Sequence, residues 1–229
     1  MLYTSLTPKF FGVNLFGDYN DLDKLYNVIH HCAVGFAEDS SAQRHLHYVA
    51  YEVRHALQGQ GKKHLWKSNE GEQNTYYGST FPLPYYLLFV NLMQNAFTQE
   101  RRLYQTATIL NLVSDLQETA MNSGCLQFTN SVDYWAFNSL LNQPRLIPGS
   151  NITSAIRDKD YLTVTADYAV WKFIKVAPKN RLAKLGQVMD FMHAYSDEHK
   201  RALEDLRSLG IFPKEGAHLE FEMLEPKQW

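Results

Sequence analysis

The residues best suited to chemistry gather between Arg44 and His55. If this segment is helical, the rotation of about 100° per residue places two arginines, two histidines and two tyrosines on one face. A histidine can carry a proton near neutral pH, and an arginine can hold a carboxylate or a phosphate through two parallel hydrogen bonds. This polar face consists of Arg44, His47, Tyr48, Tyr51, Arg54 and His55.

The surroundings of this face are basic. Residues 44–67 contain five lysines and arginines against the single acid Glu52, whereas the whole chain has a formal net charge of −2. Three interpretations are open: a solvated helix surface, a surface that binds a ligand or a nucleic acid, and a catalytic site. The favoured function is non-enzymatic binding of another protein, a second copy of the chain or a nucleotide-like anion. Nucleic acid is less favoured because the chain as a whole is acidic.

The alternative is an enzyme that uses the same residues. In a hydrolase or nuclease of the toxin or phage-defence type, His55 would act as general base, Arg54 would stabilise charge, and Tyr51 would be a third candidate. Helical ribonucleases of such systems carry an arginine followed by four to six residues and then a histidine, and no arginine in this chain precedes a histidine at that spacing. A structural role is also open, in which Arg54 pairs with a buried carboxylate or caps backbone carbonyls, for example those of the Asp18–Asp23 turn.

Two acidic segments have the spacing of metal ligands, but other roles explain them better. The run Asp18–Asp23 lacks the glycine and the glutamate of an EF-hand loop, and it fits a turn followed by a helix cap. Asp190, His193 and Asp197 would share one face of a late helix, where they could ligate a divalent metal. Their neighbours mix both signs of charge, as on an exposed helix with salt bridges. We therefore expect no structural metal and no cofactor.

A helix from Ser40 to Leu57 should position the polar face. Its opposite side repeats apolar residues at the helical period of about 3.6, and Gly59 and Gly61 follow its end. The predicted buried stripe consists of Leu46, Val49, Ala50, Val53 and Leu57.

Other elements follow from similar patterns. Residues 1–16 look extended, and Asn20–Asp21 should cap a first helix that ends near His30 and His31. Residues 60–75 look like a polar turn region, and Gly78 should form a bulge in the next strand. The remaining predicted elements are a strand over 74–81, helices over 85–97, 99–122, 132–141, 153–176 (with a β-prone run at 161–165) and 180–209, and an edge strand over 219–223.

These elements together predict an α+β fold dominated by helices, with a small N-terminal sheet packed on helices and a helical C-terminal half. The 229 residues fit a single domain, in which segment 143–151 could separate an α/β part (1–142) from a mainly helical part (151–229). Neither a signal peptide nor a membrane span is legible, and Cys32 and Cys125 match no disulfide or metal spacing. We expect a soluble protein of the cytoplasm.

Two motifs of this chain resemble a known family. The first is G-D-Y-x-D-L-D-x-L-Y at residues 17–26, and the second is Y-x-x-R-H-A-x-x-G at residues 51–59. Over roughly residues 1–95, the chain resembles a bacterial family classified only as a domain of unknown function. The resemblance implies a bacterial cytoplasmic protein and marks Tyr51, Arg54 and His55 as motif residues. It implies no activity.

Overall fold

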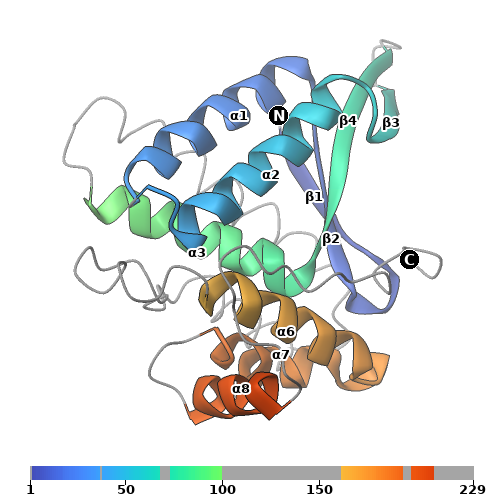
Figure 1. Ribbon diagram of the computed structural model, residues 1–229. Helices are drawn as coiled ribbons and strands as arrows, with labels where there is room; N and C mark the ends of the chain where they lie inside the picture. Colours follow the sequence, from blue (N-terminus) through green and yellow to red (C-terminus); the bar gives the residue numbers. More distant parts are fainter. Residues whose placement is uncertain (1, 37, 68–72, 100–160, 193–196, 209–229) are drawn as a thin grey trace.

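The strands of the N-terminal part pair into a four-stranded antiparallel sheet in the order β1-β2-β4-β3 (Figure 1). The computed structural model describes residues 2–36, 38–67, 73–99, 161–192 and 197–208. The strands are β1 (Tyr3–Leu6), β2 (Gly12–Gly17), β3 (Lys62–Lys67) and β4 (Gln73–Pro82).

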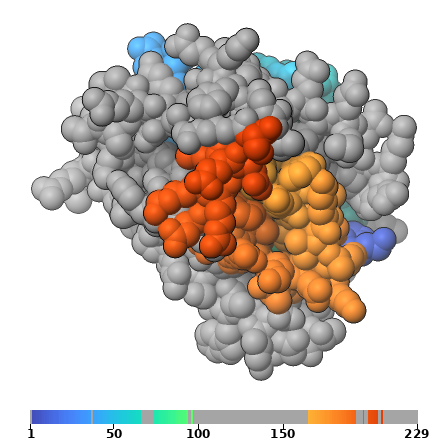
Figure 2. Space-filling view, turned by 60° about the horizontal axis from the view of Figure 1, so that its bottom comes forward, coloured from blue at the N-terminus to red at the C-terminus, as the bar shows by residue number. Residues whose placement is uncertain are grey.

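The described helices are α1 (Tyr19–Val34), α2 (Ser41–Leu57), α3 (Leu83–Gln99), α6 (Tyr161–Lys175), α7 (Arg181–Asp190) and α8 (Asp197–Ser208), with the short 3-10 turns η1 (Pro8–Phe10) and η2 (Pro178–Asn180). Helices α1 and α2 lie side by side and, with α3, pack against the sheet. Helix α6 packs on α2 and α3, and α7 and α8 pack on α6 (Figure 2). The predicted α+β fold, with a small N-terminal sheet and dominant helices, is confirmed.

Side chains alternate between the two faces of the sheet, as they must in extended strands. Val13 and Leu15 of β2 and Phe81 of β4 are buried in the core with the helices. Asn14 and Phe16, their neighbours on β2, therefore point to the opposite side. We call this side, turned away from α1, α2 and α3, the outer face of the sheet.

Side-chain caps fix where α1 and α2 begin. The carboxylate of Asp18 accepts a hydrogen bond from the backbone N of Asp21 at 2.9 Å, and this bond holds the pKa of Asp18 below its usual value. The predicted cap at Asn20–Asp21 was therefore placed too late, although the turn-and-cap role of the acidic run is confirmed. Helix α2 begins as predicted, because the Ser40 hydroxyl accepts from the backbone N of Gln43 at 3.2 Å.

The region predicted as polar turns contains strand β3, so that prediction is wrong. Lysines dominate β3 because it is the edge strand of the sheet, where charged side chains reach solvent and discourage pairing with other chains. The predicted bulge at Gly78 is also wrong, since Gly78 pairs in regular register with both Phe16 and Lys62. A side chain cannot fit there, because a Cβ would lie 2.3 Å from the backbone O of Leu15.

The single late helix predicted over 180–209 is also wrong. Helix α7 ends at Asp190 and α8 begins at Asp197, so these two residues lie on different helices and do not share one helix face, as the metal-ligand alternative required. The break lets α8 pack on α6, where Ala202 is buried in a cluster with Tyr168. His193 lies outside the described residues, as do the elements predicted over 99–122, 132–141 and 219–223 and the boundary at 143–151.

The run at 161–165 is helical, although its residues favour strands. It begins α6, whose Ala166, Ala169 and Phe173 recur at helical spacing and are buried. These residues belong to the same buried cluster as α1, α2, α3 and the sheet, so tertiary packing overrides the local preference. None of the helices in the described segments is long and apolar enough to cross a membrane.

Candidate functional site

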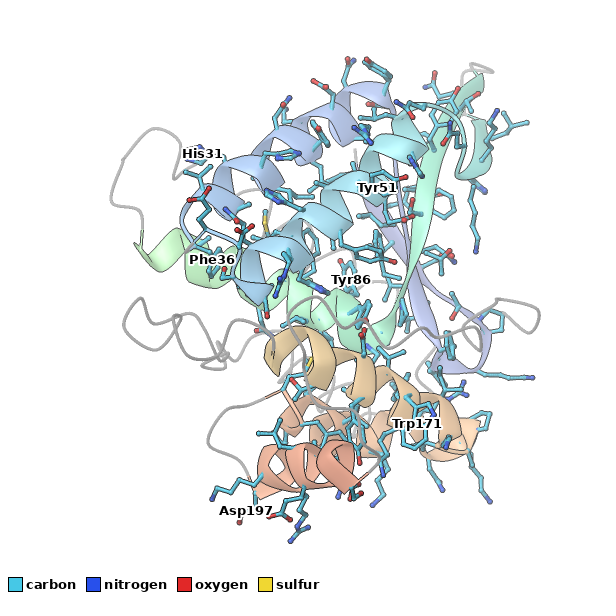
Figure 3. All side chains as sticks on the ribbon, viewed as in Figure 1. His31, Phe36, Tyr51, Tyr86, Trp171 and Asp197 are labelled. Atoms are coloured by element: carbon cyan, nitrogen blue, oxygen red, sulfur yellow. The ribbon has the colours of Figure 1, made fainter. Side chains whose placement is uncertain are left out.

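The polar face of α2 lies where the sequence places it. His47, Tyr48, Tyr51 and Arg54 are exposed, and Arg44 and His55 are half-buried. The predicted stripe on the opposite side is buried, except that Leu57 is only partly covered. Figure 3 shows Tyr51 on the outward side of α2, and 46% of its surface is accessible to solvent.

Tyr51, Arg54 and His55 form a compact group within one turn of α2. The rings of Tyr51 and His55 lie 4.0 Å apart, and the guanidinium carbon of Arg54 lies 5.1 Å from the centre of the Tyr51 ring. Among the described residues, no carboxylate pairs with Arg54. The structural role in which Arg54 would pair with a buried acid of the Asp18–Asp23 turn is therefore not supported, and its charge faces solvent.

Helix α1 adds two residues that sequence analysis did not assign to the site. His30 lies 4.5 Å from the Tyr26 ring and 5.3 Å from the His47 ring, measured between ring centres. Burial, followed by the nearby His47 and Arg54, lowers the pKa of His30. Helix α1 continues to Val34, so His30 sits within the helix and faces α2 rather than ending it.

These residues lie on two helices that pack against each other, and we call them together the α1–α2 face. Tyr26 and His30 share one side of α1 because they are four residues apart, and this spacing was the only sequence signal for them. Their contact with α2 depends on how the two helices pack, which sequence periodicity does not reveal. The α1–α2 face consists of Tyr26, His30, Arg44, His47, Tyr51, Arg54 and His55.

Tyr48, the remaining predicted residue, lies closer to a different group. Its ring is 6.2 Å from Tyr85 of α3, which in turn lies 5.2 Å from the ring of the buried His45. The Tyr85 hydroxyl donates a hydrogen bond to the carboxyl of Asp167 on α6. We call these four residues, where α2, α3 and α6 meet, the junction cluster.

Burial sets the protonation of the junction cluster. It raises the pKa of Asp167 to about 7 and lowers the pKa of His45 to about 4. Tyr48 keeps 44% of its surface exposed, but the side chains packed around the rest of it shield it from water; this shielding, with the carboxylates of Glu52 and Asp167, raises the pKa of Tyr48 to about 12. His45 and Tyr48 are therefore uncharged at neutral pH.

Glu52 provides a carboxylate near His55, three residues along α2. It is half-buried, and burial raises its pKa while His55 opposes that shift. A carboxylate beside an imidazole can orient a histidine that acts as a base. In the segments that the structure describes, no three metal-ligating side chains come together to hold an ion.

Comparison with known proteins finds one family. A family model described as Domain of unknown function (DUF6904) matches residues 2–210. No curated protein and no solved structure matches the chain. The match is wider than the resemblance seen over roughly residues 1–95, and it includes α6, α7 and α8.

Proposed function

Since the chain belongs to the DUF6904 family, whose function is unknown, we propose from the geometry of its own residues that it is a non-enzymatic binding protein. Its α1–α2 face recognises an anionic group on its partner. The observation that carries this proposal is the guanidinium of Arg54, which is exposed, lies over the Tyr51 ring and has no carboxylate partner among the described residues.

The residue types of the α1–α2 face suit a partner that carries a negatively charged group, on either a nucleotide or a protein surface. An exposed arginine can bind a carboxylate or phosphate with two hydrogen bonds, and tyrosine and arginine are enriched in binding interfaces. His30, His47 and His55 surround this arginine with further hydrogen-bond donors. The partner is either an acidic protein surface or a nucleotide-like anion, and both offer the group that Arg54 would hold.

Calorimetric titration of the whole chain tests the proposal with two defined probes. One is a nucleoside 5′-monophosphate, and the other is a peptide of about ten glutamates, long enough to offer several carboxylates. Arg54→Ala should weaken binding at least about tenfold because it removes a charged hydrogen-bond donor. Arg54→Lys should also weaken binding, because it keeps the charge and loses the planar pair of donors.

Lys184→Ala is the matched control, since Lys184 is exposed on α7 and its substitution removes the same charge. It should leave binding unchanged. The proposal fails if neither probe binds the unaltered protein, or if Lys184→Ala weakens binding as much as Arg54→Ala. The probe that binds more tightly distinguishes an acidic protein surface from a nucleotide-like partner.

The second candidate function is a hydrolase or nuclease of the toxin or phage-defence type. The half-buried carboxylate of Glu52 beside His55 favours it, with His55 as base and Arg54 stabilising charge. An assay with a chromogenic phosphodiester tests it directly. The enzyme hypothesis expects turnover that His55→Ala abolishes, whereas the binding hypothesis expects no turnover from the unaltered protein.

We also propose that the protein belongs to a bacterial cytoplasm. The motifs around residues 17–26 and 51–59 support a bacterial source. The two cysteines of the chain match no disulfide spacing, which suits a reducing compartment. Cell fractionation with antibodies against the chain tests the location.

A further inference from the structure

The outer face of the sheet carries a cluster of aromatic rings drawn from all four strands. Tyr3 of β1 stacks on Phe16 of β2, with ring centres 5.1 Å apart and planes inclined by 16°. Tyr76 of β4 meets Tyr3 edge-on at 5.6 Å, and His64 of β3 lies 6.0 Å from both Tyr3 and Phe16. His64 is exposed, and Tyr3 and Tyr76 are partly exposed.

A polar row runs beside these rings on the same face. Strand register places Ser5, Asn14 and Thr80 next to one another across the sheet, and Lys62 pairs with Gly78 in the adjoining row that also holds Tyr3 and Phe16. Asn14 donates to the Ser5 hydroxyl at 3.2 Å and accepts from the Thr80 hydroxyl at 2.7 Å. The ammonium of Lys62 donates to the same Asn14 oxygen at 2.8 Å, which fixes an exposed positive charge beside the aromatic cluster.

The outer face also differs from the rest of the chain in charge. By strand register, the described residues on this side include Lys62 but neither aspartate nor glutamate. The chain as a whole has a net charge of −2, so a face free of acids among the described strand residues is a local departure from its composition.

We propose that the outer face binds single-stranded nucleic acid. The bases of a single strand expose both ring faces, and they can stack on Tyr3 and Tyr76, as bases do on aromatic residues of other sheet surfaces. A phosphate of the same strand can then reach Lys62, which is held in place by Asn14. In a duplex the bases are stacked on one another, so their ring faces are not free to stack on Tyr3 and Tyr76. This site is separate from the α1–α2 face, and its argument does not depend on that face.

Fluorescence anisotropy with labelled oligonucleotides of about 12 nucleotides, within the usual range of site sizes, tests the proposal. The full chain should bind single-stranded RNA or DNA and bind the matching DNA duplex more weakly. Comparing the affinities for the single-stranded RNA and DNA shows whether ribose or deoxyribose is preferred. Binding should weaken as salt rises, because phosphate contacts release counterions.

Two pairs of variants test whether base stacking on Tyr76 and the charge of Lys62 contribute to binding. In each pair, one variant removes the interaction and the other is its matched control. Tyr76→Leu should weaken binding by about 5- to 100-fold, while Tyr76→Phe keeps the ring and retains binding. Lys62→Gln should weaken binding more than Lys63→Gln, because the two residues are adjacent and equally charged but Lys63 points to the other side, over the Tyr77 ring. Melting temperatures identify any variant that is unfolded.

The proposal is overturned if no single strand binds the unaltered protein, or if the duplex binds as well as the single strands. It is also overturned if Tyr76→Phe loses as much affinity as a folded Tyr76→Leu, or if the two lysine variants lose affinity equally. Should Tyr76→Leu fail to fold, the lysine pair decides the outcome.

Discussion

Single residues of the junction cluster illustrate how burial produces opposite responses to pH. Folding raises the pKa of Asp167 from 3.8 to about 7, so the folded protein holds a proton that the unfolded chain has released, and stability falls as pH rises through this interval. Folding lowers the pKa of His45 from 6.5 to about 4. Between these two values His45 is protonated in the unfolded chain and neutral in the folded protein. That effect makes stability rise with pH over about 4 to 6.5. The two effects oppose each other where their intervals overlap.

Asp167→Asn should therefore expose the contribution of His45. Asparagine does not ionise, and its oxygen can still accept from the Tyr85 hydroxyl. The free energy of unfolding of the variant, relative to the unaltered protein, should increase by about 1.4 kcal/mol per pH unit between pH 4 and 7. Urea denaturation at a series of pH values measures this difference. A difference that stays constant with pH would show that Asp167 is not a buried, titrating carboxyl in the folded state.

Sequence reasoning at this scale succeeded within α2 and failed between elements. All six residues predicted on the polar face lie on one side of α2, because helical periodicity fixes their directions. His30 and Asp167 were missed as interacting groups, since their neighbours come from other helices. The spacing that made Asp190 and Asp197 look like ligands held only if the chain between them stayed helical.

At the scale of elements, one side of α2 is buried in the core and the other side faces solvent. Leu46, Val49, Ala50 and Val53 are almost wholly buried, whereas Tyr51 and Arg54 face solvent. The same helix can therefore stabilise the core and present a binding surface. Strand β3 was missed because its lysine-rich sequence has no buried stripe. Its place in the sheet depends on pairing with β4, a contact that local sequence does not encode.

Truncations along α2 test this division. Leu46→Ala should lower the free energy of unfolding by about 2–5 kcal/mol, because it leaves a cavity at a fully buried position. Leu57→Ala should cost less, since Leu57 is only partly buried. Arg54→Ala should change stability by no more than about 0.5 kcal/mol, the usual range for an exposed position. Thermal melts of the three variants give the ranking, and equal losses would mean that the orientation of α2 is wrong.

At the scale of the whole molecule, Arg181 links the N-terminal part to the C-terminal helices. Its buried guanidinium donates hydrogen bonds to the backbone oxygens of Lys9, Ile174 and Val176, at 2.9, 3.2 and 3.2 Å. One cluster of buried residues also extends from the sheet through α3 into α6 and α7. Both observations support the proposal of a single domain, which stays a prediction for the chain as a whole.

Removing this link should destabilise the protein. Arg181→Ala leaves three carbonyl groups without their charged donor, and it should lower the free energy of unfolding by about 2–5 kcal/mol. Lys179→Ala, an exposed position two residues earlier, is the matched control and should be close to neutral. Denaturant unfolding measures both. A small loss for Arg181→Ala would show that the C-terminal helices are held by apolar packing alone.

Histidine ring signals in NMR spectra test the central claim, that the α1–α2 face binds an anionic group, most directly. As the tighter of the nucleotide and glutamate probes is added, the signals of His30, His47 and His55 should shift together, while buried His45 stays in place. The same titration of Arg54→Ala should lose these shifts. The account would be contradicted by a probe that binds while the signals of these three histidines do not shift. A shift of the His64 signal in that case would show that the probe had bound the outer face of the sheet instead.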